Sequence, residues 1–144
     1  MNVKYKEVKT IREFIDAVRL RVEVFILEQG SKPGWEPDEN DKSSRNYVAI
    51  ADGKVVSTAR FRESAQGEIK IERMATRKEC RGKGIGAGLL EFMLKEIKKS
   101  KPKRIWAMCQ VRSQPFYERY GFEAISKPYD IYGMMHVDTE YKKK

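Results

Sequence analysis

The sequence has few of the residues that build covalent or metal-held scaffolds. Among its 144 residues are two cysteines, one histidine and five prolines. The cysteines, Cys80 and Cys109, are too few for a disulfide framework, and neither has the Cys or His spacing that a zinc site needs. We therefore expect a protein of a reducing compartment that holds no metal.

Long apolar runs are also missing. No segment approaches the roughly 20 apolar residues of a membrane-spanning helix. The first residues, MNVKYKEV, lack the apolar core of a signal peptide. These absences predict a soluble, cytoplasmic protein without a membrane partner.

Acidic residues are outnumbered by basic ones. Thirty Lys and Arg against 21 Asp and Glu give a net charge of +9. A basic chain favours anionic partners, but charge alone does not distinguish a nucleotide from a nucleic acid or a membrane surface. Part of the surplus lies in residues 142–144 and 98–104, which is typical of solvated ends and loops.

What the sequence does contain is a succession of short periodic segments that fits one α/β domain over residues 1–144. Thr10 and Glu13 form a capping box before a helix whose apolar residues recur from Ile11 to Ile26. Further helices are predicted over about 82–99 and 113–120, and strands over 2–8, 46–51, 54–63, 68–76, 104–109, 122–125 and 131–141. This order predicts a mixed sheet with helices on both faces.

The longest irregular stretch runs from Gly30 to Arg45 and contains Pro33, Gly34 and Pro37. Loops of this length often act as lids over functional sites, and disorder is the alternative.

Four glycines, Gly82, Gly84, Gly86 and Gly88, stand at the start of the helix in CRGKGIGAGLLEFMLKEIKK. Glycine inside a helix costs about 1 kcal/mol relative to alanine, so this cluster needs another reason. Free backbone amides at a helix N-terminus attract anions, which predicts a phosphate cradle. A glycine-rich turn or close helix packing is the alternative.

Two familiar phosphate motifs do not fit this cluster. A P-loop needs Ser or Thr after Gly-Lys, whereas Gly82-Lys83 is followed by Gly84. A dinucleotide fingerprint needs an acid at the end of the next strand, which here ends in Cys109-Gln110.

Three segments in order resemble the GNAT acyltransferase superfamily. They are the strand IERMAT, the turn RGKGIG from Arg81 to Gly86, and QPFYERYGFEAI, which carries Tyr117. LRVEVFILEQ, the position of Gln110 and the C-terminal HVD are similar to the ElaA-type branch. The resemblance implies a single GNAT-like α/β domain over 1–144, with a mixed, mainly antiparallel sheet of six to seven strands.

The same resemblance implies that the cofactor is acetyl-CoA. The pyrophosphate would bind the amides of the glycine turn, and the pantetheine would bond the backbone of the strand before it. Gln110 stands where many members have Asn, so its role stays open. The residues implied in cofactor binding are Met74, Ala75, Thr76, Arg81, Gly82, Lys83, Gly84, Ile85, Gly86, Gln110 and Phe116.

For catalysis, the resemblance implies that Tyr117 protonates the leaving thiolate and that an amide near Met74 polarises the thioester carbonyl. Glu72 is a candidate base, and Glu28 and His136 are candidate residues on the acceptor side. A structural or surface carboxylate is the alternative for both glutamates. Cys109 is interpreted as a packed residue because no His or Asn accompanies it.

These inferences predict an N-acetyltransferase that moves the acetyl group to a primary amine, of a small molecule or a protein, by direct attack in a ternary complex. The acidic segment from Glu36 to Asp41 favours a cationic acceptor. The alternatives are a CoA-binding regulator without catalysis and a basic nucleic-acid module. The sequence leaves open the acceptor, the acyl length beyond acetyl, and whether the protein forms a homodimer.

Overall fold

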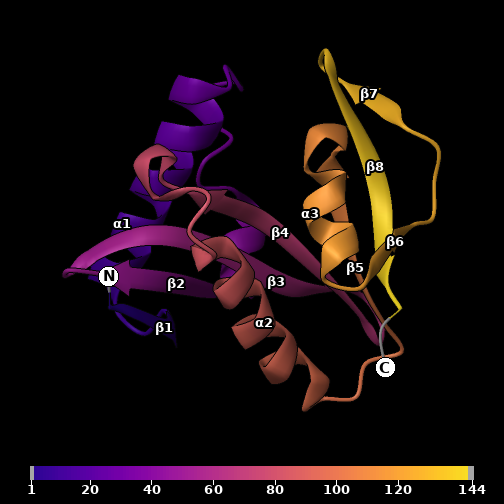
Figure 1. Ribbon diagram of the computed structural model, residues 1–144, viewed down its shortest axis with the longest axis horizontal. Helices are drawn as coiled ribbons and strands as arrows, with labels where there is room; N and C mark the ends of the chain where they lie inside the picture. Colours follow the sequence, from indigo (N-terminus) through magenta and orange to yellow (C-terminus); the bar gives the residue numbers. More distant parts are fainter. Residues whose placement is uncertain (1, 143–144) are drawn as a thin grey trace.

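The computed structural model describes residues 2–142, which form one eight-stranded sheet flanked by three α-helices (Figure 1). The strands are β1 (Val3–Glu7), β2 (Arg45–Ala51), β3 (Lys54–Ala65), β4 (Glu68–Thr76), β5 (Arg104–Gln110), β6 (Phe122–Ala124), β7 (Tyr129–Ile131) and β8 (Met134–Tyr141). The α-helices are α1 (Ile11–Arg21), α2 (Ile85–Lys98) and α3 (Gln114–Arg119). Within this part of the chain, no helix combines the length and apolar composition needed to cross a bilayer.

The sheet is mixed and mainly antiparallel. Its strands follow the order β1-β2-β3-β4-β5-β8-β6, with β7 paired to β8, and β4–β5 is the parallel pair among residues 2–142. The Asp52-Gly53 hairpin forms as the sequence predicts, with φ of 52° and 76°. The segment 131–141, predicted as one strand, is instead interrupted at Tyr132 and Gly133, whose φ values of 49° and 85° turn the chain into the β7–β8 hairpin.

The two long helices cover opposite faces of the sheet (Figure 1). Because neighbouring residues of a strand point to opposite faces, Tyr47 of β2 packs with Leu90 and the rest of the α2 core, whereas Val48 packs with Leu20 of α1. Both clusters are buried, since Leu90 on the α2 side and Val48 on the α1 side are each 0% exposed. The apolar periodicity of α2 therefore reflects core packing.

Helix α1 starts as the sequence predicts and ends differently. Thr10 accepts a hydrogen bond from the Glu13 amide, and Glu13 accepts one from the Thr10 amide, each at 3.1 Å. After Arg21 the helix widens into a π-helical segment, Val22–Glu28, in which the Gln29 amide bonds the Val24 carbonyl five residues back. π-helical turns are frequent at functional sites, and this one delivers Gln29 to the cavity described below.

Strands β4 and β5 separate halfway along their length. Their pairing runs only from Glu68–Arg104 to Ile71–Ala107, although both strands continue beyond it. Just past the separation, β4 carries a bulge, where Arg73 and Met74 together face Ala59 of β3. Arg73 adopts φ +58°, a conformation that non-glycine residues rarely take. Bulges of this kind often redirect the backbone next to active sites.

Candidate active site

A cavity of about 510 Å³ opens where β4 and β5 separate. Its walls come from the end of the π-helical segment and the following loop, from β4, from β5, and from the β7–β8 hairpin. The predicted site residues that line it are Glu72, Met74, Gln110, Tyr117 and His136. The topology therefore brings together predicted residues from four elements, β4, β5, α3 and β8.

Tyr117 reaches the cavity from within the core. Helix α3 begins with Pro115 in its first turn, and the Tyr117 ring packs edge to face with Phe116 and Phe122 at centroid distances of 5.2 and 5.5 Å. The residue is 8% exposed, and burial raises the pKa of its phenol above the ordinary value of 10.0. The hydroxyl is therefore neutral at physiological pH and can donate a proton.

Cys109 lies in the same wall and is inert. Burial raises the pKa of its thiol to about 11, so the nucleophilic thiolate is scarce at neutral pH. This agrees with its interpretation as a packed residue. Within residues 2–142 no group of His, Cys, Asp and Glu side chains is arranged as a metal site.

His136 is held by two neighbouring strands. Its position in β8 is opposite Gln110 of β5 and Tyr129 of β7, and its ring stacks on Tyr129 at a centroid distance of 6.3 Å. Its Nδ1 lies 2.8 Å from the Met134 carbonyl oxygen. Because a carbonyl can only accept, Nδ1 carries the hydrogen, and the lone pair of the neutral ring is on Nε2.

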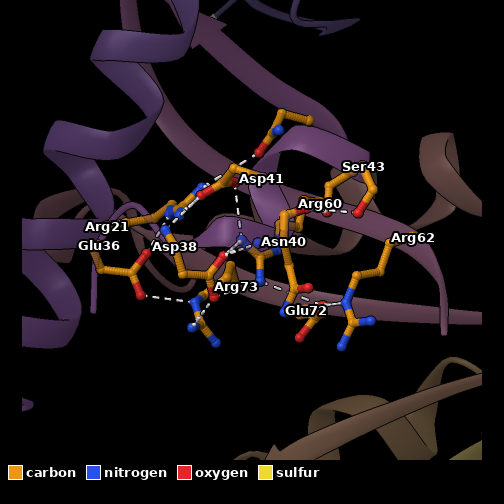
Figure 2. A network of polar contacts seen from close by, with 12 residues as sticks. Arg21, Glu36, Asp38, Asn40, Asp41, Ser43, Arg60, Arg62, Glu72 and Arg73 are labelled. Atoms are coloured by element: carbon orange, nitrogen blue, oxygen red, sulfur yellow. Dashed lines mark hydrogen bonds and ion pairs between the residues drawn. The ribbon is translucent and has the colours of Figure 1, made fainter. Parts of the chain in front are cut away.

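Glu72 is surrounded by cations. Its carboxylate contacts Arg60 at 3.4 Å and also contacts Arg62 (Figure 2). Lys70 lies 3.4 Å from the same carboxylate. Burial alone would raise the pKa of Glu72, but the charge of Lys70 and the hydrogen bond from Arg62 outweigh it and hold that pKa below its usual value. A carboxylate with a lowered pKa is a weak base, so this environment disfavours proton abstraction by Glu72.

The acidic loop after the π-helical segment is neutralised by buried arginines (Figure 2). Three of its four carboxylates each contact two arginines at 2.6–2.9 Å: Glu36 pairs with Arg21 and Arg73, Asp38 with Arg60 and Arg73, and Asp41 with Arg21 and Arg60. Arg21 and Arg60 are 1% and 0% exposed. The loop is thus ordered, with a short 3₁₀ helix at Glu39–Ser43. Its fourth carboxylate, Glu39, is exposed and does not line the cavity, so the loop presents no unpaired carboxylate to an acceptor there.

The first two glycines of the cluster form an open turn. Gly82 and Gly84 adopt φ of 77° and 79°, and a Cβ at either position would meet nothing within 4 Å. Gly84 is the N-cap of α2, where no side chain caps the free amides. An accessible turn of unpaired amides at a helix N-terminus fits the predicted phosphate cradle.

The next two glycines serve close packing. A Cβ on Gly86 would lie 3.2 Å from Thr76 Oγ1, and one on Gly88 would lie 2.1 Å from the hydroxyl of Tyr5. The close-packing interpretation therefore holds for Gly86 and Gly88, and the phosphate cradle stays a prediction for Gly82 and Gly84.

Two consecutive residues at the end of the π-helical segment reach the two sides of the site. Glu28 accepts hydrogen bonds of 2.7 and 2.8 Å from Arg81 beside the glycine turn. Gln29 accepts a hydrogen bond of 2.9 Å from Gln110 on β5. Glu28 is absent from the cavity wall, so the structure relates it to the glycine turn and not to the acceptor side predicted from the sequence.

Comparison with known proteins fits this geometry. The model of the family described as "Acetyltransferase (GNAT) domain" matches residues 6–143. The chain belongs to the GNAT acetyltransferase family. Two relatives cover nearly the same length: the uncharacterized N-acetyltransferase YjcF of Bacillus subtilis is 28% identical and covers 83% of this chain and 84% of its own, and a UPF0039 protein of Schizosaccharomyces pombe is 32% identical over 94% and 91%.

Solved structures share the GNAT fold over almost the whole chain. Escherichia coli ElaA superimposes with a TM-score of 0.88 at 21% identity and covers 98% of this chain and 100% of its own. An acyl-CoA N-acyltransferase from Pseudomonas aeruginosa gives a TM-score of 0.84 at 25% identity, covering 98% and 99%. The predicted fold class is confirmed, with one more strand than the upper expectation.

Several residues predicted from the GNAT motifs use their side chains for structure. Ala75 and Ile85 are buried in the core, Thr76 shares a hydrogen bond of 2.9 Å with Ser57, and Phe116 packs on Tyr120. Lys83 is exposed on the glycine turn. Any contact that Ala75, Thr76 or Ile85 makes with a cofactor would therefore come mainly from the backbone.

Among the cavity residues that sequence reasoning missed are Trp35, Lys70, Arg73 and Tyr132. Trp35 and Tyr132 meet across the mouth at a centroid distance of 5.4 Å. A two-residue turn that ends in glycine is typical of β-hairpins, so the Tyr132-Gly133 pair could have revealed the β7–β8 hairpin. Arg73 and Lys70 gave no local signal because their positions depend on the bulge and the strand separation.

Proposed function

We propose that this GNAT protein transfers an acetyl group from acetyl-CoA to a primary amine by direct attack within a ternary complex. The observation that supports this most is the separation of β4 and β5, which lies between an open glycine turn and a cavity containing a buried, neutral tyrosine. One side offers amides for a diphosphate, and the other offers a proton donor.

In this proposal, the glycine turn binds the pyrophosphate of coenzyme A. The backbone amides at the start of α2 serve the diphosphate without a metal, and Lys83 adds positive charge at the rim. Arg81 lies beside the same turn, where its charge is paired with Glu28. The edge of β4 from Met74 to Thr76 is unpaired toward β5, and it hydrogen-bonds the pantetheine as an added strand would.

The chemistry then divides among three groups. His136 takes a proton from the amine through Nε2, which is better suited than the cation-bound carboxylate of Glu72. The nitrogen attacks the thioester carbonyl, and the Met74 amide at the bulge stabilises the oxyanion. The C–S bond breaks as Tyr117 donates its proton to the thiolate, which yields the acetylated amine and free coenzyme A.

A pair of measurements tests this function. Calorimetry should show stoichiometric binding of coenzyme A, and a thiol-release assay with acetyl-CoA should show turnover that depends on an added amine. Binding without amine-dependent release would favour a CoA-binding regulator instead. Nucleic-acid affinity that falls steeply with salt, without coenzyme A binding, would favour the basic nucleic-acid module.

A further inference from the structure

The cavity wall contains more cationic than anionic side chains. Three cations, Lys32, Lys70 and Arg73, line it together with two carboxylates, Glu36 and Glu72. The sequence alone suggested the opposite balance, because Glu36 begins an acidic segment.

Both carboxylates of the wall are already occupied. The Glu36 side chain is 3% exposed and lies between Arg21 and Arg73, at 2.6 and 2.7 Å. The Glu72 side chain is 8% exposed and contacts three cations. A second positive charge on an acceptor would therefore find no unpaired carboxylate here and would face the cations.

Lys70 is the least exposed of these three cations, whereas Arg73 is paired with Glu36 and Asp38 and Lys32 is exposed over the Tyr132 ring. The Lys70 side chain is 11% exposed, and its ammonium lies 3.4 Å from Glu72 and 4.9 Å from the Trp106 ring centroid. Among the described residues its ammonium makes no hydrogen bond to a protein acceptor. Three N–H donors on a largely buried ammonium at a cavity wall suit an anionic oxygen.

The mouth of the cavity is aromatic. Trp35 comes from the loop after the π-helical segment and Tyr132 from the β7–β8 hairpin, and they contact each other although they are 37% and 75% exposed. Ile131 and Phe25 continue this apolar wall. Aromatic side chains left this exposed beside a cavity are suited to cover an apolar group of a ligand.

We propose that the acceptor is an α-amino acid with a large apolar or aromatic side chain, whose carboxylate binds Lys70 and whose side chain lies against Trp35 and Tyr132. The amine then faces His136, which shares this cavity. This inference rests on the proposed acetyltransferase function and names its acceptor. Amino acids and phosphorylated amines both combine an amine with an anionic group. The apolar mouth of the cavity favours the amino acid.

The test compares acceptors by thiol release from acetyl-CoA. L-phenylalanine should exceed phenylalanine amide and phenethylamine in kcat/KM roughly tenfold or more, the effect of one charge-assisted hydrogen bond. The amine of the amide is less basic and so more readily deprotonated, which means that a preference for phenylalanine must come from its carboxylate. Phosphoethanolamine and Nα-acetyl-lysine amide complete the panel.

Three variants locate the anion site. Lys70→Gln should raise KM for phenylalanine roughly tenfold and leave phenethylamine unaffected, whereas Lys70→Arg should restore most of the loss because it keeps the charge. Lys54→Gln, an exposed lysine at the start of β3, is the matched control and should change neither substrate. Equal losses for both substrates in Lys70→Gln would overturn the proposed contact.

The outcomes separate the two proposals. Turnover in which the amide, phenethylamine or the lysine derivative equals phenylalanine would overturn the amino-acid acceptor and leave the acetyltransferase function standing. A preference for phosphoethanolamine would overturn the apolar amino acid in favour of another anionic amine. If no amine in a broad library releases thiol, the acetyltransferase function itself fails.

Discussion

Two buried ionisable residues of the site, Tyr117 and Glu72, have pKa values shifted in opposite directions, although burial alone would raise both. Tyr117 has aromatic neighbours, so burial raises the pKa of its phenol and keeps the proton on the oxygen. Glu72 has three cationic neighbours, which lower the pKa of its carboxyl and keep the proton off. Charged neighbours therefore decide which of the two can donate a proton and which remains a permanent anion.

Tyr117→Phe is expected to lower kcat by roughly 10²- to 10⁴-fold, the usual contribution of general acid catalysis. Coenzyme A affinity should stay nearly constant, because the ring packing with Phe116 and Phe122 is kept. Steady-state thiol release and calorimetry measure the two quantities. A variant with unchanged kcat would show that the tyrosine has only a packing role.

Asp41 gives a residue-scale prediction for pH. Burial opposes ionisation, but the hydrogen bond and charge of Arg21 lower the pKa of Asp41 from 3.8 to about 2. A lowered folded-state pKa stabilises the fold fully above pH 3.8, and the stabilisation is lost as pH falls through about 2. Asp41→Asn should therefore lower the free energy of unfolding by about 2 kcal/mol at pH 7, and by progressively less below pH 4.

Urea unfolding from pH 7 down to pH 2 measures this difference. Asp52→Asn is the control, because Asp52 is exposed in the β2–β3 turn and Asn also tolerates its φ of 52°. A difference between Asp41→Asn and the parent that stays constant down to pH 2 would contradict the ion-pair explanation.

Among the elements, α2 combines two demands at its N-terminus. Its first glycines keep amides accessible, and its later ones let the helix approach Thr76 and Tyr5. The two pairs of glycines could not be distinguished in the sequence, because both demands select glycine. They differ only in what a side chain would meet, which depends on β1 and β4 and could not be predicted from the helix itself.

Gly84→Val is expected to weaken coenzyme A binding by at least roughly tenfold, because the side chain would shield the free amides at the N-cap. The substitution also strains the backbone at φ 79°, by about 1–2 kcal/mol. Gly53→Val carries the same strain at φ 76°, also without contacts, but lies in the β2–β3 turn. Calorimetry should show that only Gly84→Val loses affinity, and equal affinities would count against the cradle.

For the molecule as a whole, local chemistry made much of the fold predictable. The capping box at Thr10 and Glu13, the Asp52-Gly53 turn and the apolar face of α2 each depend on residues close in sequence. Order along the chain and the GNAT resemblance supplied the mixed sheet with helices on both faces, but not the β7–β8 hairpin or the π-helical segment.

What could not be predicted depends on contacts between distant residues. Arg21 and Asp41 are 20 residues apart, and Arg60 and Asp38 are 22 apart, so the acidic segment resembled a free surface in the sequence. The same holds for Glu28, whose partner Arg81 is 53 residues away. The sequence around a charged side chain does not indicate which residue it will pair with. The role of the side chain nevertheless depends on that partner.

The π-helical segment from Val22 to Glu28 has a consequence for how the two halves of the site are joined. Successive residues of an ordinary helix are offset by about 100° around its axis. Deleting one residue from this segment would restore ordinary α-helical winding and rotate Glu28 and Gln29 together about the helix axis. Glu28 would then lose its hydrogen bonds with Arg81, and Gln29 would lose its hydrogen bond with Gln110. The number of residues in the π-helical segment therefore determines both contacts, that of Glu28 with Arg81 and that of Gln29 with Gln110.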